Sequence, residues 1–208
     1  MARILVFTKA PVPGQVKTRL TPRLSPEQAA RVHLALLQRT VGVAAGASLA
    51  GVELWVADDP ENEQIRQLAE RHDLAVKRQT GADLGDRMYQ AAAATLGQGR
   101  LPIIIGTDCP EMNAQYLGEA CRGLERGIDV VLGPAEDGGY VLIGLSTDEP
   151  RLFQGVSWGT SAVMDETRER IRECVLTSIE LDTLWDLDRP EDLARLDLSR
   201  LLDDPTSL

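Results

Sequence analysis

The stretch Pro102-Ile-Ile-Ile-Gly-Thr-Asp-Cys-Pro110 places a short run of apolar residues directly before a glycine, an aspartate and a proline. A short apolar run bounded by such residues is typical of a buried strand. Strands buried on both faces occur in parallel sheets that helices cover. The stretch therefore predicts an α/β protein in which Asp108 stands at the carboxyl end of the most hydrophobic strand.

Strand and helix patterns alternate on both sides of this stretch, which predicts a three-layer α/β/α fold with a mixed, mostly parallel sheet. Two predicted strands near Val130 and Val141 have no helix between them, so one pairing should be antiparallel. We expect one domain over residues 1–208. The predicted strands are 4–8, 52–57, 74–78, 102–105, 129–133, 140–144 and 178–181. The predicted helices are 26–45, 60–72, 86–96, 113–126, 161–173 and 189–197.

Composition and charge limit the classes of partner. The net charge of −10 argues against nucleic acid, whose phosphates would be repelled. Residues 1–26 nevertheless contain five cations and no acid, which favours a small anionic ligand. No apolar run approaches the roughly 18 residues that span a membrane. The three cysteines are not spaced as CxxC pairs, so we expect reduced thiols and a cytoplasmic protein, with a homodimer left open.

The loop after the first strand, residues 9–20, reads KAPVPGQVKTRL. Lys9, Lys17 and Arg19 supply positive charge, and Gly14 allows the backbone to approach an anion closely. Because ligands of such sheets bind at the carboxyl ends of the strands, the loop is a candidate phosphate site. It matches neither the P-loop nor the GxGxxG pattern, and an ordinary basic surface loop is the alternative.

Two aspartates are candidate ligands of Mg²⁺ or Mn²⁺, which prefer oxygen donors and are held jointly by carboxylates and substrate phosphates. Asp108 is the first, and the alternative is that it caps a turn before Pro110. Asp188 is the second, and it shares one side of an extended segment with Asp186. The alternative for Asp188 is the N-cap of the last predicted helix.

Three further loops carry candidate residues. The loop at 134–140 predicts an Asp-Gly hairpin turn, in which Asp137 is a candidate base and the flanking residues face an acceptor. The segment 81–87 is either a nucleotide contact or a capped helix start. Trp158 is as compatible with the core as with a substrate. Both histidines fall inside predicted helices without HExxH spacing, so histidine catalysis is not expected. The candidate nucleotide-binding residues here are Gly85 and Arg87, and the candidate acceptor-binding residues are Gly138, Gly139, Tyr140, Trp158 and Thr160.

Six motifs occur in order along nearly the whole chain: KAPVPGQVKTRL, GADLGDRM, GTDCP, GPAEDGGYVLIGL, WGT and DLDRPEDL. Together they resemble the radical-SAM/selenodomain-associated transferase family, which is glycosyltransferase-A-like. More distantly the sequence is similar to the molybdenum-cofactor guanylyltransferases and the 2-phospholactate guanylyltransferases. The resemblance implies the nucleotide-diphospho-sugar transferase (GT-A) fold. It also implies phosphate binding at Gly14, Lys17 and Arg19, and metal binding at Asp108.

The leading hypothesis is a metal-dependent transferase that uses a nucleotide-sugar or an NTP and a small-molecule acceptor. Lys17 and Arg19 would hold phosphates, Asp108 and Asp188 the metal, and Asp137 would act as a base toward the acceptor. A guanylyltransferase-like nucleotidyltransferase acting on a phosphorylated small acid is the second hypothesis. A nucleotide-binding module without catalysis is the third.

Overall fold

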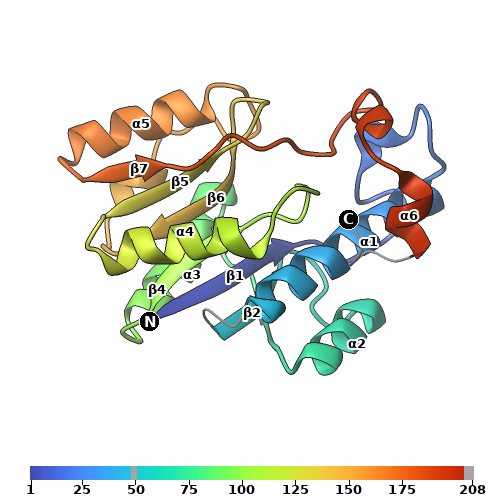
Figure 1. Cartoon of the computed structure of the whole chain (residues 1–208), viewed down its shortest axis with the longest axis horizontal. Helices are drawn as coiled ribbons and strands as arrows, with labels where there is room; N and C mark the ends of the chain where they lie inside the picture. The colour runs from blue at the N-terminus through green and yellow to red at the C-terminus, as the bar shows by residue number, and fades with distance from the viewer. Residues whose placement is uncertain (48–50, 204–208) are drawn as a thin grey trace.

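The computed structural model describes residues 1–47 and 51–203 and shows a seven-stranded sheet with helices on both faces (Figure 1). The strands are β1 (Ala2–Thr8), β2 (Gly51–Val56), β3 (Ala75–Arg78), β4 (Leu101–Ile105), β5 (Val130–Pro134), β6 (Tyr140–Leu145) and β7 (Ser178–Glu180). The α-helices are α1 (Pro26–Gly46), α2 (Glu63–His72), α3 (Leu84–Leu96), α4 (Ala114–Glu125), α5 (Val163–Glu173) and α6 (Leu198–Asp203). Three short 3-10 helices are η1 (Thr18–Leu20), η2 (Pro150–Phe153) and η3 (Asp192–Arg195).

The sheet order is β3-β2-β1-β4-β6-β5-β7. Strands β3, β2, β1 and β4 are parallel to one another, whereas β6 is antiparallel to both β4 and β5. The predicted mixed, mostly parallel sheet is therefore confirmed, and so is the antiparallel pairing of the strands near Val130 and Val141. Strand β6 makes a second antiparallel pairing, with β4, that the sequence analysis did not predict. The carboxyl ends of β1 to β4 lie at one edge, so the loops after these strands meet there.

Alternating side chains of each strand pack into different cores on the two faces of the sheet. On β1, Ile4 and Val6 belong to the core under α1, α2 and α4, whereas Leu5 and Phe7 belong to the core under α3 and α5. This alternation follows from the strand geometry, which directs successive side chains to opposite faces. Because both faces are buried, the strands read as continuous apolar runs in the sequence.

Most predicted elements appear within a few residues of their expected ends. The helix start at Ser25 has the expected capping box, in which the Ser25 side chain accepts from the N–H of Gln28 and the Gln28 side chain accepts from the N–H of Ser25. The helix predicted at 60–72 begins later, at Glu63, because the Asn62 side chain provides its N-cap.

The prediction of one helix at 189–197 was wrong. The Asp192 carboxylate accepts the N–H groups of Asp188 and Arg189 and closes a turn there, so only the short η3 follows. Asp197 then caps a separate helix, α6, by accepting the N–H of Arg200. Leucines on both sides of this break pack against α1, which holds the segment across the molecule.

The C-terminal segment, residues 181–203, leaves β7 and crosses to α1 at the other side of the molecule (Figure 1). Its Trp185 and Leu187 are buried with Leu20 and Leu36 in a third apolar cluster. The crossing carries the segment past the carboxyl edge of the sheet.

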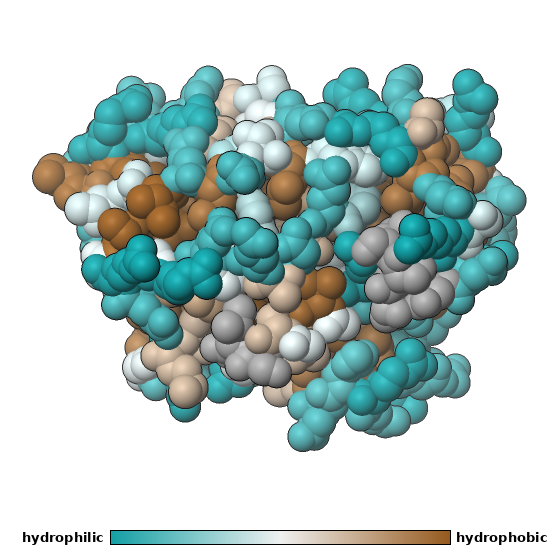
Figure 2. Space-filling model, in the orientation of Figure 1, coloured by the Kyte–Doolittle hydropathy of each residue, from teal (hydrophilic) through white to brown (hydrophobic). Residues whose placement is uncertain are grey.

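Hydrophilic residues cover much of the face shown in Figure 2, with apolar residues between them. In the part of the chain that the structure describes, no helix combines the length and the apolar character that crossing a membrane requires.

We expect Ser25→Ala to lower the free energy of unfolding by about 1 kcal/mol, because the N–H of Gln28 loses its acceptor. Urea denaturation of the two proteins measures the difference. Ser25→Asp restores an acceptor at the same position and should recover most of the loss. Equal stability of Ser25→Ala and the wild type would contradict the capping role.

Candidate active site

A cavity of about 410 Å³ lies at the carboxyl edge of the sheet, where the loops after β1, β2, β3 and β4 meet the C-terminal segment. We call it the first cavity. Its charged lining residues come from segments far apart in the sequence, and six of the candidate site residues are among them: Lys9, Lys17, Arg19, Arg87, Asp108 and Asp188. The fold therefore brings the predicted phosphate-binding cations and the predicted metal-binding carboxylates to one place.

Lys17 lies at the centre of this arrangement. Its Nζ is 2.8 Å from Asp108 Oδ1 and also donates to the carbonyl oxygen of Leu187. The Lys17 side chain is only 3% exposed, so the ammonium depends on these two protein partners. Its backbone has a φ of 48°, an unusual conformation for a residue other than glycine. Lys17 thus joins three loops and places its charge in the lining of the first cavity.

Asp108 keeps its charge at the edge of the first cavity. Burial alone would raise its pKa, but its neighbours, the ammonium of Lys17 first among them, hold the pKa below the usual range. The Asp108 side chain is 45% exposed, so the carboxylate remains open to the cavity. Its backbone carbonyl accepts the N–H of Leu187 at 2.8 Å, which fixes the C-terminal segment against the loop after β4.

The C-terminal segment adds two aspartates to the site. Asp188 lines the first cavity and pairs with Arg19. Burial, together with the negative charges of Asp108 and Asp137, raises the pKa of Asp186 to about 7. Sequence spacing places Asp186 beside Asp188 without assigning it a role, and it does not reveal which other residues surround Asp186. Asp186 is thus a buried carboxyl group that lies near the carboxylates of Asp108 and Asp137.

His33 lies on α1 and lines the first cavity, although sequence reasoning gave it no role. Its Nε2 is 3.0 Å from the carbonyl oxygen of Lys9 and 3.3 Å from Thr8 Oγ1. Burial lowers the pKa of His33, so we assign a neutral ring that donates to the Lys9 carbonyl. His33 therefore holds the start of the loop after β1, the candidate phosphate site, through its contact with the Lys9 carbonyl. No local sequence motif predicts this contact of His33, because the contact depends on how α1 packs on the sheet.

A second cavity of about 220 Å³ adjoins the first. Phe7, Arg19, Leu84 and Gly106 line both cavities, so the two share a boundary. Five of the candidate acceptor and base residues line the second cavity: Asp137, Gly139, Tyr140, Trp158 and Thr160.

Trp158 forms one wall of the second cavity and contacts Tyr140 edge-on, with ring centroids 6.3 Å apart. Gly85 backs this wall, since a Cβ on Gly85 would lie 2.5 Å from Trp158 Nε1. The absence of a side chain at Gly85 lets the indole lie against α3. The structure thus gives Gly85 a packing contact and places it in neither cavity lining.

Two other glycines among the candidates also lie outside both cavity linings. Gly138 has a φ of 89°, and a Cβ there would lie 2.3 Å from the carbonyl oxygen of Ser161, so glycine is required for the turn. Gly14 is exposed with a φ of 77° and shapes the loop before Lys17. Their binding roles remain predictions, whereas their backbone roles follow from geometry.

The carboxylates do not form a closed metal cage. Within residues 1–47 and 51–203, no group of three or more His, Cys, Asp or Glu side chains is arranged to hold a metal ion. Asp108 and Asp188 line one cavity, and each pairs with a cation of the loop after β1. Two carboxylates open to a cavity fit Mg²⁺ or Mn²⁺ when substrate phosphates complete the coordination.

The fold is that of the nucleotide-diphospho-sugar transferases. A protein from Desulfovibrio desulfuricans G20 described as a candidate nucleotide-diphospho-sugar transferase superposes with a TM-score of 0.84 at 28% identity, over 98% of this chain and 95% of that one. The 4-diphosphocytidyl-2C-methyl-D-erythritol synthase of Anaerococcus prevotii DSM 20548 has a TM-score of 0.59 at 9% identity, covering 93% and 94%. Glucosyl-3-phosphoglycerate synthase of Mycobacterium tuberculosis, solved with Mg²⁺ and UDP, has a TM-score of 0.52 at 10% identity, covering 97% and 76%.

The chain belongs to the family described as "Uncharacterized protein conserved in bacteria (DUF2064)", whose model matches residues 40–160. Among curated proteins, the comparison found no match. The expected family fold is confirmed, and the similar solved structures are those of transferases.

We expect His33→Gln to flatten the loss of stability on acidification. The pKa of His33 in the folded protein lies below 6.5, so below about pH 6.5 the unfolded chain binds a proton that the folded chain resists. Stability therefore falls as the pH drops through this window, and a neutral glutamine removes that contribution. Urea unfolding at pH 7.5 and at pH 5.5, both chosen to be about one unit from this value, measures the slope.

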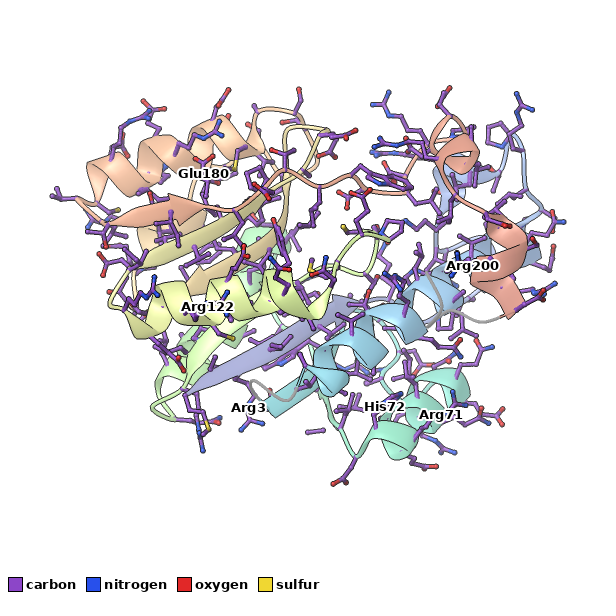
Figure 3. The ribbon with its side chains drawn as sticks, viewed as in Figure 1. Arg3, Arg71, His72, Arg122, Glu180 and Arg200 are labelled. Carbon is purple, nitrogen blue, oxygen red and sulfur yellow. The ribbon has the colours of Figure 1, made fainter. Side chains whose placement is uncertain are left out.

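The matched control is His72→Gln, at the other histidine, which lies at the end of α2 (Figure 3). Identical pH slopes for His33→Gln and the wild type would show that His33 does not titrate as described.

Proposed function

We propose that this protein is a metal-dependent transferase that binds a nucleotide-sugar or an NTP in the first cavity and a small-molecule acceptor in the second. One observation carries the proposal: Lys17 Nζ and Asp108 Oδ1 meet at 2.8 Å beside a cavity that Arg19 and Asp188 also line. Cations for phosphates and carboxylates for a metal thus lie in one place. The fold of the solved transferases supports the same class.

The first cavity suits the donor because cations from two separate segments line it. Lys9, Lys17 and Arg19 belong to the loop after β1, and Arg87 lies in the first turn of α3. Such cations bind phosphate oxygens through charge-assisted hydrogen bonds. Lys17 is already engaged with Asp108, so we assign it the joint task of orienting that carboxylate and contacting a phosphate.

Asp108 and Asp188 would hold Mg²⁺ or Mn²⁺ together with phosphate oxygens of the donor. The bound ion would stabilise the negative charge that develops on the leaving pyrophosphate or nucleoside diphosphate. Arg19, which pairs with Asp188, would then be released toward the phosphates.

Asp137 is the candidate base at the second cavity. Its Oδ1 accepts the N–H of Gly139 at 2.9 Å, which orients the carboxylate and leaves Oδ2 for the acceptor. In the transfer, the acceptor oxygen bonds to the transferred group and its proton passes to Asp137. The bond between that group and the leaving phosphate breaks.

A thermal-shift screen of nucleotides and nucleotide-sugars, each with and without Mn²⁺, tests the proposal. A ligand that binds the folded state raises the melting temperature, and we expect the largest increase with nucleotide and Mn²⁺ together. Product analysis with the best donor then separates two reactions. Release of pyrophosphate indicates nucleotidyl transfer, and release of a nucleoside diphosphate indicates glycosyl transfer.

Asp108→Asn should remove the Mn²⁺-dependent part of the thermal shift and lower turnover about 10²–10³-fold, because one electrostatic contact to the reacting phosphates is lost. The variant should remain folded but lose about 2 kcal/mol of stability, because buried Lys17 exchanges a carboxylate for a neutral oxygen. Asp148→Asn, at an exposed aspartate outside both cavity linings, is the control. Full activity and an unchanged Mn²⁺ response of Asp108→Asn would refute the metal assignment.

A further inference from the structure

The second cavity differs from the first in the character of its walls. Its floor and sides include Phe7 and Ile104 from the sheet, Met88 from α3 and the ring of Trp158. Its charged lining residues are Arg19 and Asp137. Arg19 also lines the first cavity, so at least this charge lies on the boundary between the two.

Several polar groups that line the second cavity are already used by the protein. The Thr160 hydroxyl donates to the Ser157 carbonyl at 2.8 Å and accepts the N–H of Ala162 at 3.2 Å. The carbonyl of Gly139 accepts the N–H of Ala135 at 3.0 Å, and its own N–H is bonded to Asp137. These groups hold their loops in shape and have little capacity left for a ligand.

The Tyr140 hydroxyl, in contrast, is engaged only weakly by the described part of the protein. Among the residues that the structure describes, the contact of its hydroxyl is with Met88 Sδ at 3.9 Å, and a thioether is a weak acceptor. Burial raises the pKa of Tyr140, so the hydroxyl keeps its proton. Tyr140 can therefore donate one strong hydrogen bond to a ligand in this cavity, while Asp137 Oδ2 can accept one.

A ligand with many hydroxyl groups would find too few hydrogen-bond partners in this cavity. A buried polar group without a partner opposes binding. A monosaccharide held against these walls would present more hydroxyls than Tyr140, Asp137 and the guanidinium of Arg19 at the boundary can satisfy. An apolar ring gains instead, since burying apolar surface favours binding. An apolar cavity of ~150 Å³ is large enough to bind benzene, so 220 Å³ accommodates a substituted ring.

Resting on the proposed function, we infer that the acceptor is a compact alcohol with an apolar ring or branched aliphatic body and a single hydroxyl group. The body lies against Trp158, Met88 and Ile104. The hydroxyl forms hydrogen bonds with Tyr140 and Asp137. It faces the donor in the first cavity across the boundary between the cavities, where Arg19 and Gly106 lie. A free sugar is the acceptor class that this cavity disfavours.

Benzyl alcohol and glucose, titrated separately into the protein and followed by tryptophan fluorescence and by ligand-observed saturation-transfer NMR, test the inference. We expect saturable binding of benzyl alcohol with a Kd at least tenfold below that of glucose. We also expect Trp158→Phe to remove most of the fluorescence response, because Trp55 and Trp185 line neither cavity. Tighter binding of glucose, or binding of neither probe, overturns the inference.

Gly85→Ala adds a second test, because alanine favours the helix and adds one methyl group that faces the Trp158 ring. Its Cβ would displace the Trp158 ring from α3 and should weaken benzyl alcohol binding at least fivefold. Gly97→Ala at the other end of the same helix is the matched control, since it lies outside both linings. Unchanged affinity of Gly85→Ala would contradict the proposed position of the ring.

The nucleotide thermal shift, measured on the same samples, separates the two proposals. A protein that binds benzyl alcohol but no nucleotide would refute the proposed function and leave the chemistry of the second cavity supported. A protein that binds nucleotide with Mn²⁺ but prefers glucose would refute the acceptor class alone.

Discussion

The ammonium of Lys17 is the constraint on which the rest of the site depends. A buried cation must be neutralised and hydrogen-bonded, and Lys17 meets both needs with Asp108 and the Leu187 carbonyl. Residues 17, 108 and 187 lie on three separate segments, so satisfying one charge fixes three loops relative to each other. The left-handed backbone of Lys17 adds local strain of the kind found at functional sites, and the surrounding contacts hold it in place.

This constraint also determines the electrostatics of the first cavity. Lys17 keeps Asp108 ionised, and the C-terminal segment brings Asp186 and Asp188 close to it. Arg19 balances Asp188, but Asp186 is left in a surrounding that disfavours its charge. A donor with phosphates and a divalent ion would bring both signs of charge into such a site. Under the proposed function, the cations would turn to the phosphates and the carboxylates to the ion, so that the charged side chains would exchange partners.

The sheet and most helices could be predicted from the sequence because their signals are local. The apolar run before Gly106 and the capping box at Ser25 each act over a few residues. The meeting of Lys17 and Asp108 could be predicted as well, since parallel strands end at a common edge. His33 and Asp186 could not, because their roles come from packing across the molecule. The break between η3 and α6 was missed because Asp192 and Asp197 each cap a turn that competes with a continuous helix.

The two cavities adjoin at side chains that line both of them. Phe7 ends β1 and lines each of them, and Leu84 does the same from the first turn of α3. One residue further on, Gly85 sets the position of Trp158, and Arg87 on the same helix faces the first cavity. The amino end of α3 therefore contacts both cavities at once. If a bound nucleotide displaced this turn, the Trp158 ring would move with it, because close-packed contacts transmit such shifts. The sequence GADLGDRM thus combines three physical tasks in one helix start, namely a cap, a cation and a glycine that leaves room for an aromatic wall.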